Sequence, residues 1–74
     1  MSKLTIISDK DMERLLKKLG FTAIRQNGSH KFFMHSDGRK TVVPFHNTDL
    51  KRGLIKGILN DIGLSDEAYE KIRK

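Results

Sequence analysis

The stretch "FTAIRQNGSHKFFMHSDGRKTVVPF", residues 21–45, decides the fold of this chain. It holds three short runs of β type, at 21–26, 29–36 and 39–45, joined by Asn27-Gly28 and Asp37-Gly38. Asn-Gly and Asp-Gly tolerate the positive φ angles of two-residue type I′ turns, so each pair predicts a β-hairpin. The stretch therefore predicts a three-stranded antiparallel meander. The third strand should lie at an edge or end near Pro44, because proline cannot donate to a ladder.

Two-residue turns would also determine which side chains share a face of the sheet. In that register Arg25 lies opposite His30, Ala23 opposite Phe32, and Phe32 opposite Val43. One face then carries Phe21, Ala23, Phe32, Met34, Val43 and Phe45, with Arg25 and His30 at one end. This is the more apolar face, so we expect it to pack against helices and to place His30 at the rim of the core. Phe33 would lie on the other face.

Amphipathic helices are predicted on both sides of the meander. Residues 8–19 carry one apolar stripe at helical spacing, with Ser8 as N-cap and Gly20 placed to end the helix. Residues 48–62 form a second helix, for which Thr48 is the expected N-cap and Asp49 lies in the first turn. Inside it, Gly53 and Gly57 would let another element, such as the sheet, approach the backbone closely. Residues 64–72 predict a short third helix after Ser65.

The order α-β-β-β-α with a short C-terminal helix indicates a two-layer α+β domain, with helices on one face of a small antiparallel sheet. Double-stranded-RNA-binding domains share this order, a similarity of fold that says nothing about chemistry. With 74 residues the chain is expected to form a single domain spanning residues 1–74.

Composition narrows the class of protein further. The chain has no cysteine, which excludes a disulfide framework and thiolate metal ligands. No apolar run approaches the roughly 20 residues that span a bilayer, and the start lacks the apolar region of a signal peptide. We therefore expect a soluble cytoplasmic protein that does not contact membranes.

The charge is strongly asymmetric along the chain. The net charge is +6, and nearly all of the excess lies in residues 21–57. That segment carries Arg25, Lys31, Arg39, Lys40, Lys51, Arg52 and Lys56 against only Asp37 and Asp49. Such a segment favours a polyanionic partner, of which nucleic acid is the commonest in the cytosol, although a lysine-rich solvated surface explains it equally well.

His30 is the side chain best suited to acid/base chemistry. In the predicted register Arg25 and Lys31 flank it, and two cations would lower the pKa of the imidazole below about 6.5. A neutral imidazole is a general base, and adjacent cations would hold a phosphate, a combination that suits RNA cleavage. The alternatives are a hydrogen-bonded structural histidine or a solvated one. A metal site is disfavoured, because alternation sends His30 and His35 to opposite faces.

The aromatic pair Phe32-Phe33 offers a second feature of interest. Stacked nucleobases are a common ligand of exposed aromatic rings. In the predicted register Phe32 belongs to the core, so Phe33, near Lys31 and His35, is the better candidate to stack on a base.

The chain also resembles the HicA family of small bacterial mRNA interferases, the toxin half of HicA–HicB toxin–antitoxin pairs. The matching pieces, in order, are "LLKKLGF" (15–21), "GSHKFF" (28–33), "DGRK" (37–40), "VPFHNTDLKRG" (43–53) and "ILNDIGLS" (58–65). They cover roughly residues 11–66. The resemblance implies a double-stranded-RNA-binding-like fold and RNA cleavage without a metal or other cofactor. It also implies a HicB-like antitoxin that inhibits the toxin in a hetero-oligomer, with the free toxin expected to be a monomer.

The same resemblance assigns roles to particular residues. It makes His30 the catalytic histidine and Gly28 and Ser29 the turn that presents it. His46 matches a histidine that follows the Val-Pro step of the family, and it is carried over as a contributor to RNA binding. Apart from the resemblance, the cations expected to bind RNA phosphates are Arg25, Lys31, Lys40, Lys51 and Arg52, and Ser29 is also expected to bind RNA. A non-catalytic RNA-binding module and a basic protein-interaction domain remain as alternatives.

Overall fold

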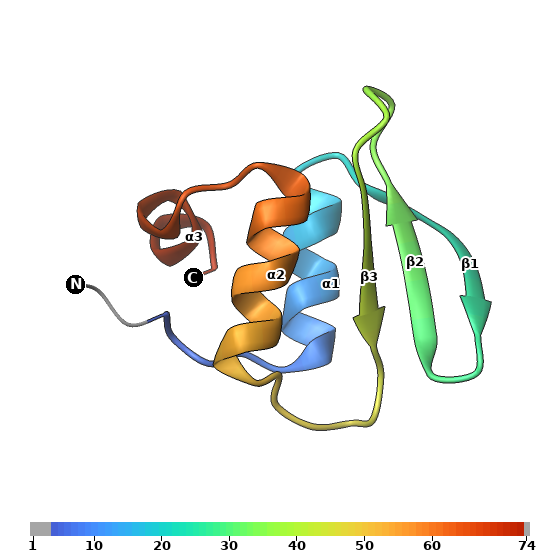
Figure 1. Ribbon diagram of the computed structural model, residues 1–74, viewed down its shortest axis with the longest axis horizontal. Coiled ribbons are helices and arrows are strands. Elements are labelled where there is room, and N and C mark those ends of the chain that lie inside the picture. Colours follow the sequence, from blue (N-terminus) through green and yellow to red (C-terminus); the bar gives the residue numbers. More distant parts are fainter. Residues whose placement is uncertain (1–3, 74) are drawn as a thin grey trace.

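The computed structural model describes residues 4–73 and shows an α+β fold (Figure 1). The elements are α1 (Asp9–Lys18), β1 (Thr22–Asn27), β2 (His30–Met34), β3 (Lys40–Pro44), α2 (Arg52–Ile62) and α3 (Asp66–Ile72). The three strands form one antiparallel sheet in the order β1-β2-β3. The predicted class, a double-stranded-RNA-binding-like arrangement with an additional C-terminal helix, is confirmed.

The helices cover one face of the sheet only. In Figure 1, α1 and α2 lie side by side next to β3, and β1 is the strand farthest from them, while α3 lies on the opposite side of the helix pair. The side chains of Phe33 and Val43 enter the core between sheet and helices and are fully buried. Within residues 4–73 no helix covers the other side of the sheet, which we call the open face.

Helix α1 begins and ends where local sequence signals place it. The Ser8 hydroxyl accepts a hydrogen bond from the Asp11 backbone N–H at 3.1 Å, which is the expected N-cap. At the other end the Phe21 N–H donates to the Leu16 carbonyl at 2.9 Å, and Gly20 has a φ of 94°. Such a bond across a left-handed glycine is the Schellman motif that terminates helices. The apolar stripe of α1 consequently faces the core, with Met12, Leu15 and Leu16 buried.

The second hairpin differs from the prediction by one residue. The His35 N–H donates to the Arg39 carbonyl at 2.9 Å, so the loop has three residues, 36–38, rather than two. Gly38 has a φ of 99°, as the last position of such a loop requires. A shift of one residue moves a strand's side chains to the opposite face. Val43 therefore pairs with Lys31 and Phe32 with Val42, instead of Phe32 with Val43.

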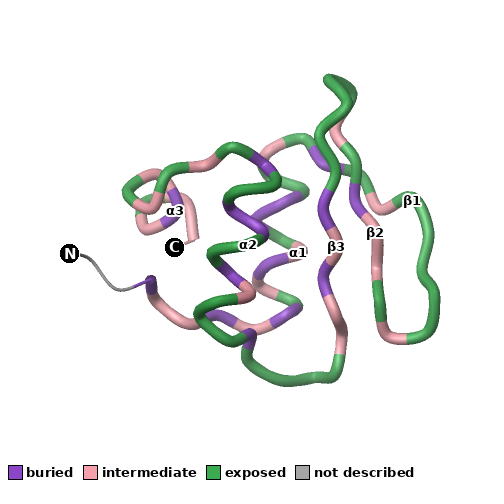
Figure 2. The backbone as a smooth tube through the Cα atoms, viewed as in Figure 1, coloured by how far each residue is buried: buried purple, intermediate pink, exposed green. Residues whose placement is uncertain are grey.

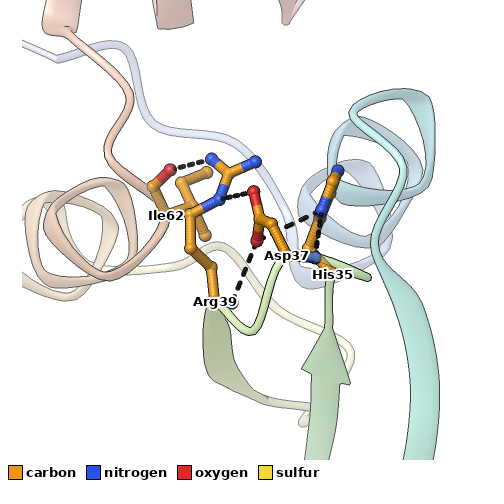
Figure 3. A network of polar contacts seen from close by, with 4 residues as sticks. All are labelled: His35, Asp37, Arg39 and Ile62. Carbon is orange, nitrogen blue, oxygen red and sulfur yellow. Dashed lines mark hydrogen bonds and ion pairs between the residues drawn. The ribbon is translucent and has the colours of Figure 1, made fainter.

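Polar contacts hold this loop at its observed length (Figure 3). The Asp37 carboxylate accepts hydrogen bonds from the backbone N–H and Nε of Arg39, at 3.1 and 2.8 Å, and the Asp37 N–H donates to His35 Nδ1 at 3.1 Å. The Arg39 guanidinium also donates to the carbonyl of Ile62, at the end of α2. The loop is thus anchored to a helix that follows it by some twenty residues, which no local sequence signal reveals.

The first hairpin also closes one residue later than predicted. Asn27 pairs with His30, so Gly28 and Ser29 are the turn residues, and Gly28 takes the positive φ of 61°. Between Ala23 and Arg25 the register shifts by one residue, which leaves Ile24 in a bulge. Consequently Arg25 lies opposite Phe32 instead of His30, and Ala23 opposite Phe33 instead of Phe32.

The longer second loop reverses the predicted roles of the aromatic pair, because it places Val43 on the same face as Phe33. Phe33 is fully buried in the core, whereas Phe32 is only partly buried and lies on the open face. The expectation that the helices cover the face containing Phe32, Met34 and His30 is therefore wrong. The covered face carries Lys31, Phe33, Thr41 and Val43, as contacts from Lys31 to Glu13 of α1 and from Thr41 to Asp61 of α2 show.

Helix α2 begins at Arg52, four residues after the predicted N-cap Thr48. The intervening segment is extended because it pairs with the chain before α1: Ser8 and Asp49 form a β-bridge, and the Leu50 N–H donates to the Ile7 carbonyl at 2.9 Å. Burial of Leu50 accompanies this pairing. Asp49 therefore lies outside the helix, and no acidic residue occupies its first turn.

No other element approaches the backbone of α2 closely at its two glycines, contrary to the prediction. A Cβ atom placed on Gly53 or Gly57 would meet nothing within 4 Å, so neither the sheet nor another described element packs against these positions.

Helix α3 packs on the helix pair through its buried Tyr69. The Tyr69 hydroxyl donates to the Thr5 carbonyl at 2.5 Å, and Glu70 accepts from both the N–H and the hydroxyl of Thr5 at 2.8 Å. The segment before α1 and α3 thus hold each other. No helix within residues 4–73 is long and apolar enough to cross a membrane.

Candidate functional site

His30 is exposed at the first residue of β2, directly after the turn formed by Gly28 and Ser29. Alternation along β2 places its side chain on the open face together with Phe32 and Met34. It lies between Asn27 on one neighbouring strand and Pro44 on the other. Within residues 4–73 the imidazole makes no hydrogen bond or ion pair, so it is neither a core residue nor a structural one. The expected position at the rim of the core is wrong, but the side chain is accessible.

The loop that follows β3 brings His46 to the same end of the molecule. The Phe45 N–H donates to the Ser29 carbonyl at 2.6 Å, which joins this loop to the first turn. His46 is the next residue and is exposed. Figure 1 shows the first turn, the loop and the start of α2 together at the lower end of the view. The structure therefore gathers Ser29, His30 and His46, three of the residues expected at the site.

A buried carboxylate, Asp9 at the start of α1, holds this loop in place. Asp9 is 1% exposed. Its carboxylate accepts hydrogen bonds from the backbone N–H groups of Lys10 at 2.7 Å, His46 at 2.9 Å and Thr48 at 3.4 Å. Burial alone would raise the pKa of the Asp9 carboxyl. The hydrogen bonds outweigh burial, so this pKa lies below its ordinary value of 3.8.

Sequence analysis missed this role of Asp9. An aspartate in the first turn of a helix is common because the helix dipole favours it there. Its partners are backbone N–H groups almost forty residues away, and backbone groups leave no mark on the sequence.

Lys51 and Arg52 lie at the start of α2, at the same end as His30 (Figure 1). Both residues are exposed. The Arg52 Nε donates to the Leu4 carbonyl at 2.8 Å, which orients the guanidinium group. Because the first turn of α2 has no acidic residue, the positive end of the helix dipole adds to these two charges. This end of the molecule is suited to bind a phosphate group.

Two further cations, Arg25 and Lys40, lie on the open face. The Arg25 guanidinium lies over the ring of Phe32, with its carbon 4.7 Å from the ring centroid. Lys40 is exposed and pairs with Met34, at the end of the sheet away from His30. Together they extend positive charge from the centre of the open face to its far end.

Lys31 is separated from the other expected RNA-binding residues. It points to the covered side, where its Nζ lies 2.7 Å from the Glu13 Oε2 and 5.3 Å from the centroid of the Phe45 ring. The hydrogen bond from Lys31 is the main reason that the pKa of Glu13 lies below its ordinary value. Arg25 is likewise not opposite His30, so the two cations expected beside the imidazole lie elsewhere.

The three histidines do not form a metal centre. His35 lies on the covered side of the sheet, where its ring packs edge-on against Phe21 with centroids 5.1 Å apart. Among residues 4–73 there is no group of three or more histidine, aspartate or glutamate side chains placed to hold a metal ion.

These observations define a small basic α+β domain with a double-stranded-RNA-binding-like fold. The exposed histidine at its first hairpin has no polar partner among residues 4–73. Comparison with protein families then identifies the group. The model described as the HicA toxin of bacterial toxin–antitoxin systems matches residues 10–64. The chain therefore belongs to the HicA toxin family. The match includes His30, His46 and the start of α2, and it leaves out the segment before α1 and helix α3. No curated protein matches the sequence closely.

Proposed function

We propose that this toxin is an endoribonuclease that cleaves mRNA without a metal ion and uses His30 as its acid/base group. The observation that carries the proposal is the accessible imidazole of His30 on the open face, without a polar partner among residues 4–73. A histidine without a structural partner is free to exchange protons with a substrate. Membership of the HicA toxin family agrees with this chemistry, since the resemblance to that family implies cleavage of mRNA.

The reaction needs one proton removed and one supplied. A neutral His30 would take the proton of a ribose 2′-hydroxyl, and the 2′-oxygen would then form a bond to the adjacent phosphorus. The bond from phosphorus to the 5′-oxygen of the next nucleotide breaks, and that oxygen takes up a proton. Negative charge on the phosphoryl oxygens grows during this step, so cations that hold the phosphate stabilise the transition state.

The cations at the lower end and on the open face support the binding of RNA. Lys51 and Arg52 at the start of α2 would bind a phosphate of the RNA chain at the same end of the molecule as His30, and His46 would contact RNA from the adjoining loop. Arg25 and Lys40 would bind phosphates farther along the open face. Lys31, engaged with Glu13, would act on the fold rather than on RNA. Each phosphate contact makes affinity more sensitive to salt.

The toxin would act in the cytosol, where mRNA is found, as a monomer when free. A HicB-like antitoxin would inhibit it by forming a hetero-oligomer. Acidic side chains would suit an antitoxin that meets the cationic end of the chain.

The decisive experiment compares the wild type with His30→Ala in an RNA degradation assay that contains a chelator. The wild type should degrade RNA and arrest growth when expressed alone. His30→Ala should lose both activities while it binds RNA nearly as well. His35→Ala is a matched control only for histidine content, because that residue lies on the covered side and its loss should affect stability rather than chemistry.

Three results would contradict the proposal in different ways. A wild type that binds RNA but never cuts it would be a non-catalytic RNA-binding module. Cleavage that stops in the chelator would require a metal. RNA affinity that does not fall steeply between low and moderate salt would favour a basic protein-interaction domain, because phosphate contacts are lost as salt rises.

A further inference from the structure

Phe32 is an aromatic side chain at the centre of a sheet face that no described helix covers. It lies two residues beyond His30 on β2, and its strand neighbours are Arg25 on β1 and Val42 on β3. Ile24, the residue of the bulge, is 48% exposed, and Met34 is exposed as well. Figure 2 shows exposed residues along most of β1, beside this face. Apolar side chains that gather on one exposed face mark a binding site more often than single exposed ones do.

A hollow of about 260 Å³ is lined in part by Phe32. It is lined by Ile24, Phe32 and Val42, by Phe33 and Thr41 of the covered face, and by the charged residues Lys40 and Asp61. The Asp61 carboxylate accepts a hydrogen bond from the Thr41 hydroxyl at 3.0 Å, which holds it at the hollow. The hollow therefore suits a flat apolar group that carries hydrogen-bond donors at its edge.

The charges around the hollow indicate what kind of molecule brings that group. Arg25 and Lys40 stand on the open face beside it and favour an anionic polymer. Inside the hollow, the negative charge of Asp61 disfavours a phosphate. A nucleobase meets both conditions, because its ring is flat, its exocyclic amino groups donate hydrogen bonds, and its phosphates lie outside.

We propose that Phe32, with the hollow beside it, is a stacking subsite for a nucleobase of single-stranded RNA. This inference rests on the proposed function and extends it to the recognition of substrate. Residues 30 and 32 are about 7 Å apart along one face of β2, so a base on Phe32 would belong to a nucleotide adjoining the one that meets His30. Because the Arg25 guanidinium lies over the Phe32 ring, a base would stack on the guanidinium plane or take its place on the ring, since bases also stack on guanidinium planes.

The test uses Phe32→Leu, which keeps an apolar contact with Val42 and Ile24 but removes the aromatic ring. Phe32→Trp retains a ring, and Met34→Ala is a matched control on the same face outside the hollow. All variants are made in the His30→Ala background, so that RNA is bound and not cut. The probe is a short single-stranded RNA with one fluorescent 2-aminopurine base, moved through successive positions. Affinity is measured by anisotropy, and stacking by quenching of the 2-aminopurine.

We expect quenching at one position of the probe and a loss of that quenching in Phe32→Leu. Affinity should fall about 5- to 150-fold, the effect of losing one stacked base. Phe32→Trp should bind within about twofold of the parent, and Met34→Ala should be unchanged. Thermal melting checks that Phe32→Leu is folded. If Phe32→Leu is not folded, the His30→Ala parent, which keeps Phe32, still provides the test. Absence of 2-aminopurine quenching at every probe position in that protein would overturn the subsite.

Failure of the subsite and failure of the proposed function give different results. If Phe32→Leu with an intact His30 cuts and binds RNA like the wild type, the subsite is wrong and the nuclease stands. If the wild type never cuts but Phe32→Leu still loses affinity and quenching, the subsite stands without the nuclease. If Phe32→Leu still binds RNA with the affinity of its parent but no longer binds an antitoxin, the open face is a protein-binding surface and the inference is overturned.

Discussion

Replacement of Asp9 by asparagine should destabilise the whole domain, even though the change removes only one negative charge. The two carboxylate oxygens of Asp9 accept different hydrogen bonds. Oδ1 accepts from the Lys10 N–H, and Oδ2 accepts from the N–H groups of His46 and Thr48. An asparagine has one acceptor oxygen and one NH₂ group. In either orientation the NH₂ group points at a backbone N–H and leaves at least one buried donor without a partner.

The magnitude follows from the number of bonds lost. A buried donor without a partner costs about 1–3 kcal/mol, and a hydrogen bond to a charged group contributes about 1.5–3 kcal/mol. We therefore expect Asp9→Asn to lower the free energy of unfolding by about 2–4 kcal/mol, a large share of the total for a small domain. Urea denaturation followed by circular dichroism measures it. The Tm should fall by about 8 °C or more. Amide hydrogen exchange should show faster exchange of the His46 and Thr48 N–H groups.

The effect should also depend on pH. Because the pKa of Asp9 lies below 3.8 in the folded chain, its stabilisation is fully present above that value and is lost as the pH falls through the native pKa. The difference between wild type and Asp9→Asn should thus be full at pH 7 and shrink in acid. Asp11→Asn is the matched control. Among residues 4–73 that carboxylate makes only an exposed ion pair with Arg14, so its loss should change stability by less than about 0.5 kcal/mol. A change of similar size in both variants at pH 7 would refute the role assigned to Asp9.

Two further predictions concern α2 and α3. Gly57→Ala places a Cβ atom in open space within a helix, so it should raise the free energy of unfolding by about 0.5–1 kcal/mol, measured by urea denaturation; a decrease would mean that Gly57 is in contact with something. Glu70→Gln should lower the Tm at pH 7, because hydrogen bonds from Arg73 and then Thr5 lower the pKa of Glu70 from 4.5 to about 2. The stabilisation by ionised Glu70 is fully present above its ordinary pKa of 4.5 and is lost as the pH falls through its pKa of about 2 in the folded chain. The Tm difference between wild type and Glu70→Gln should therefore vanish near pH 2. A Tm difference that persists unchanged near pH 2 would contradict this role of Glu70. Glu67 is exposed on the same helix, so the control Glu67→Gln should show little change in Tm at either pH.

The elements themselves were predictable because their signals are local. Ser8 caps α1 and Gly20 follows its end, as the sequence indicated, since each acts on backbone groups within a few residues. Short stretches of neighbouring residues also predicted the order of the three strands and the α+β class. The motifs that carry the family resemblance are short stretches of the same kind. The candidate histidine was chosen by its place after the first turn and by the family resemblance, and its role stays a prediction.

The surroundings of His30 were not predictable from the sequence, because they depend on the register. Asp37-Gly38 is compatible with a two-residue and a three-residue loop. The contact between Arg39 and the end of α2 accompanies the longer one. That single residue moved Phe33 into the core and Phe32, with His30, onto the open face.

The sequence by itself determined which segments become helix or strand, where α1 is capped, and where positive charge accumulates, because these properties depend on neighbouring residues. Only the tertiary structure decided which face of the sheet the helices cover, that α2 starts at Arg52, and that Asp9 holds the loop of His46. The physical reason is that side-chain alternation has a period of two residues. A choice of one residue in a turn, made by contacts with a distant helix, therefore reassigns every side chain of a strand.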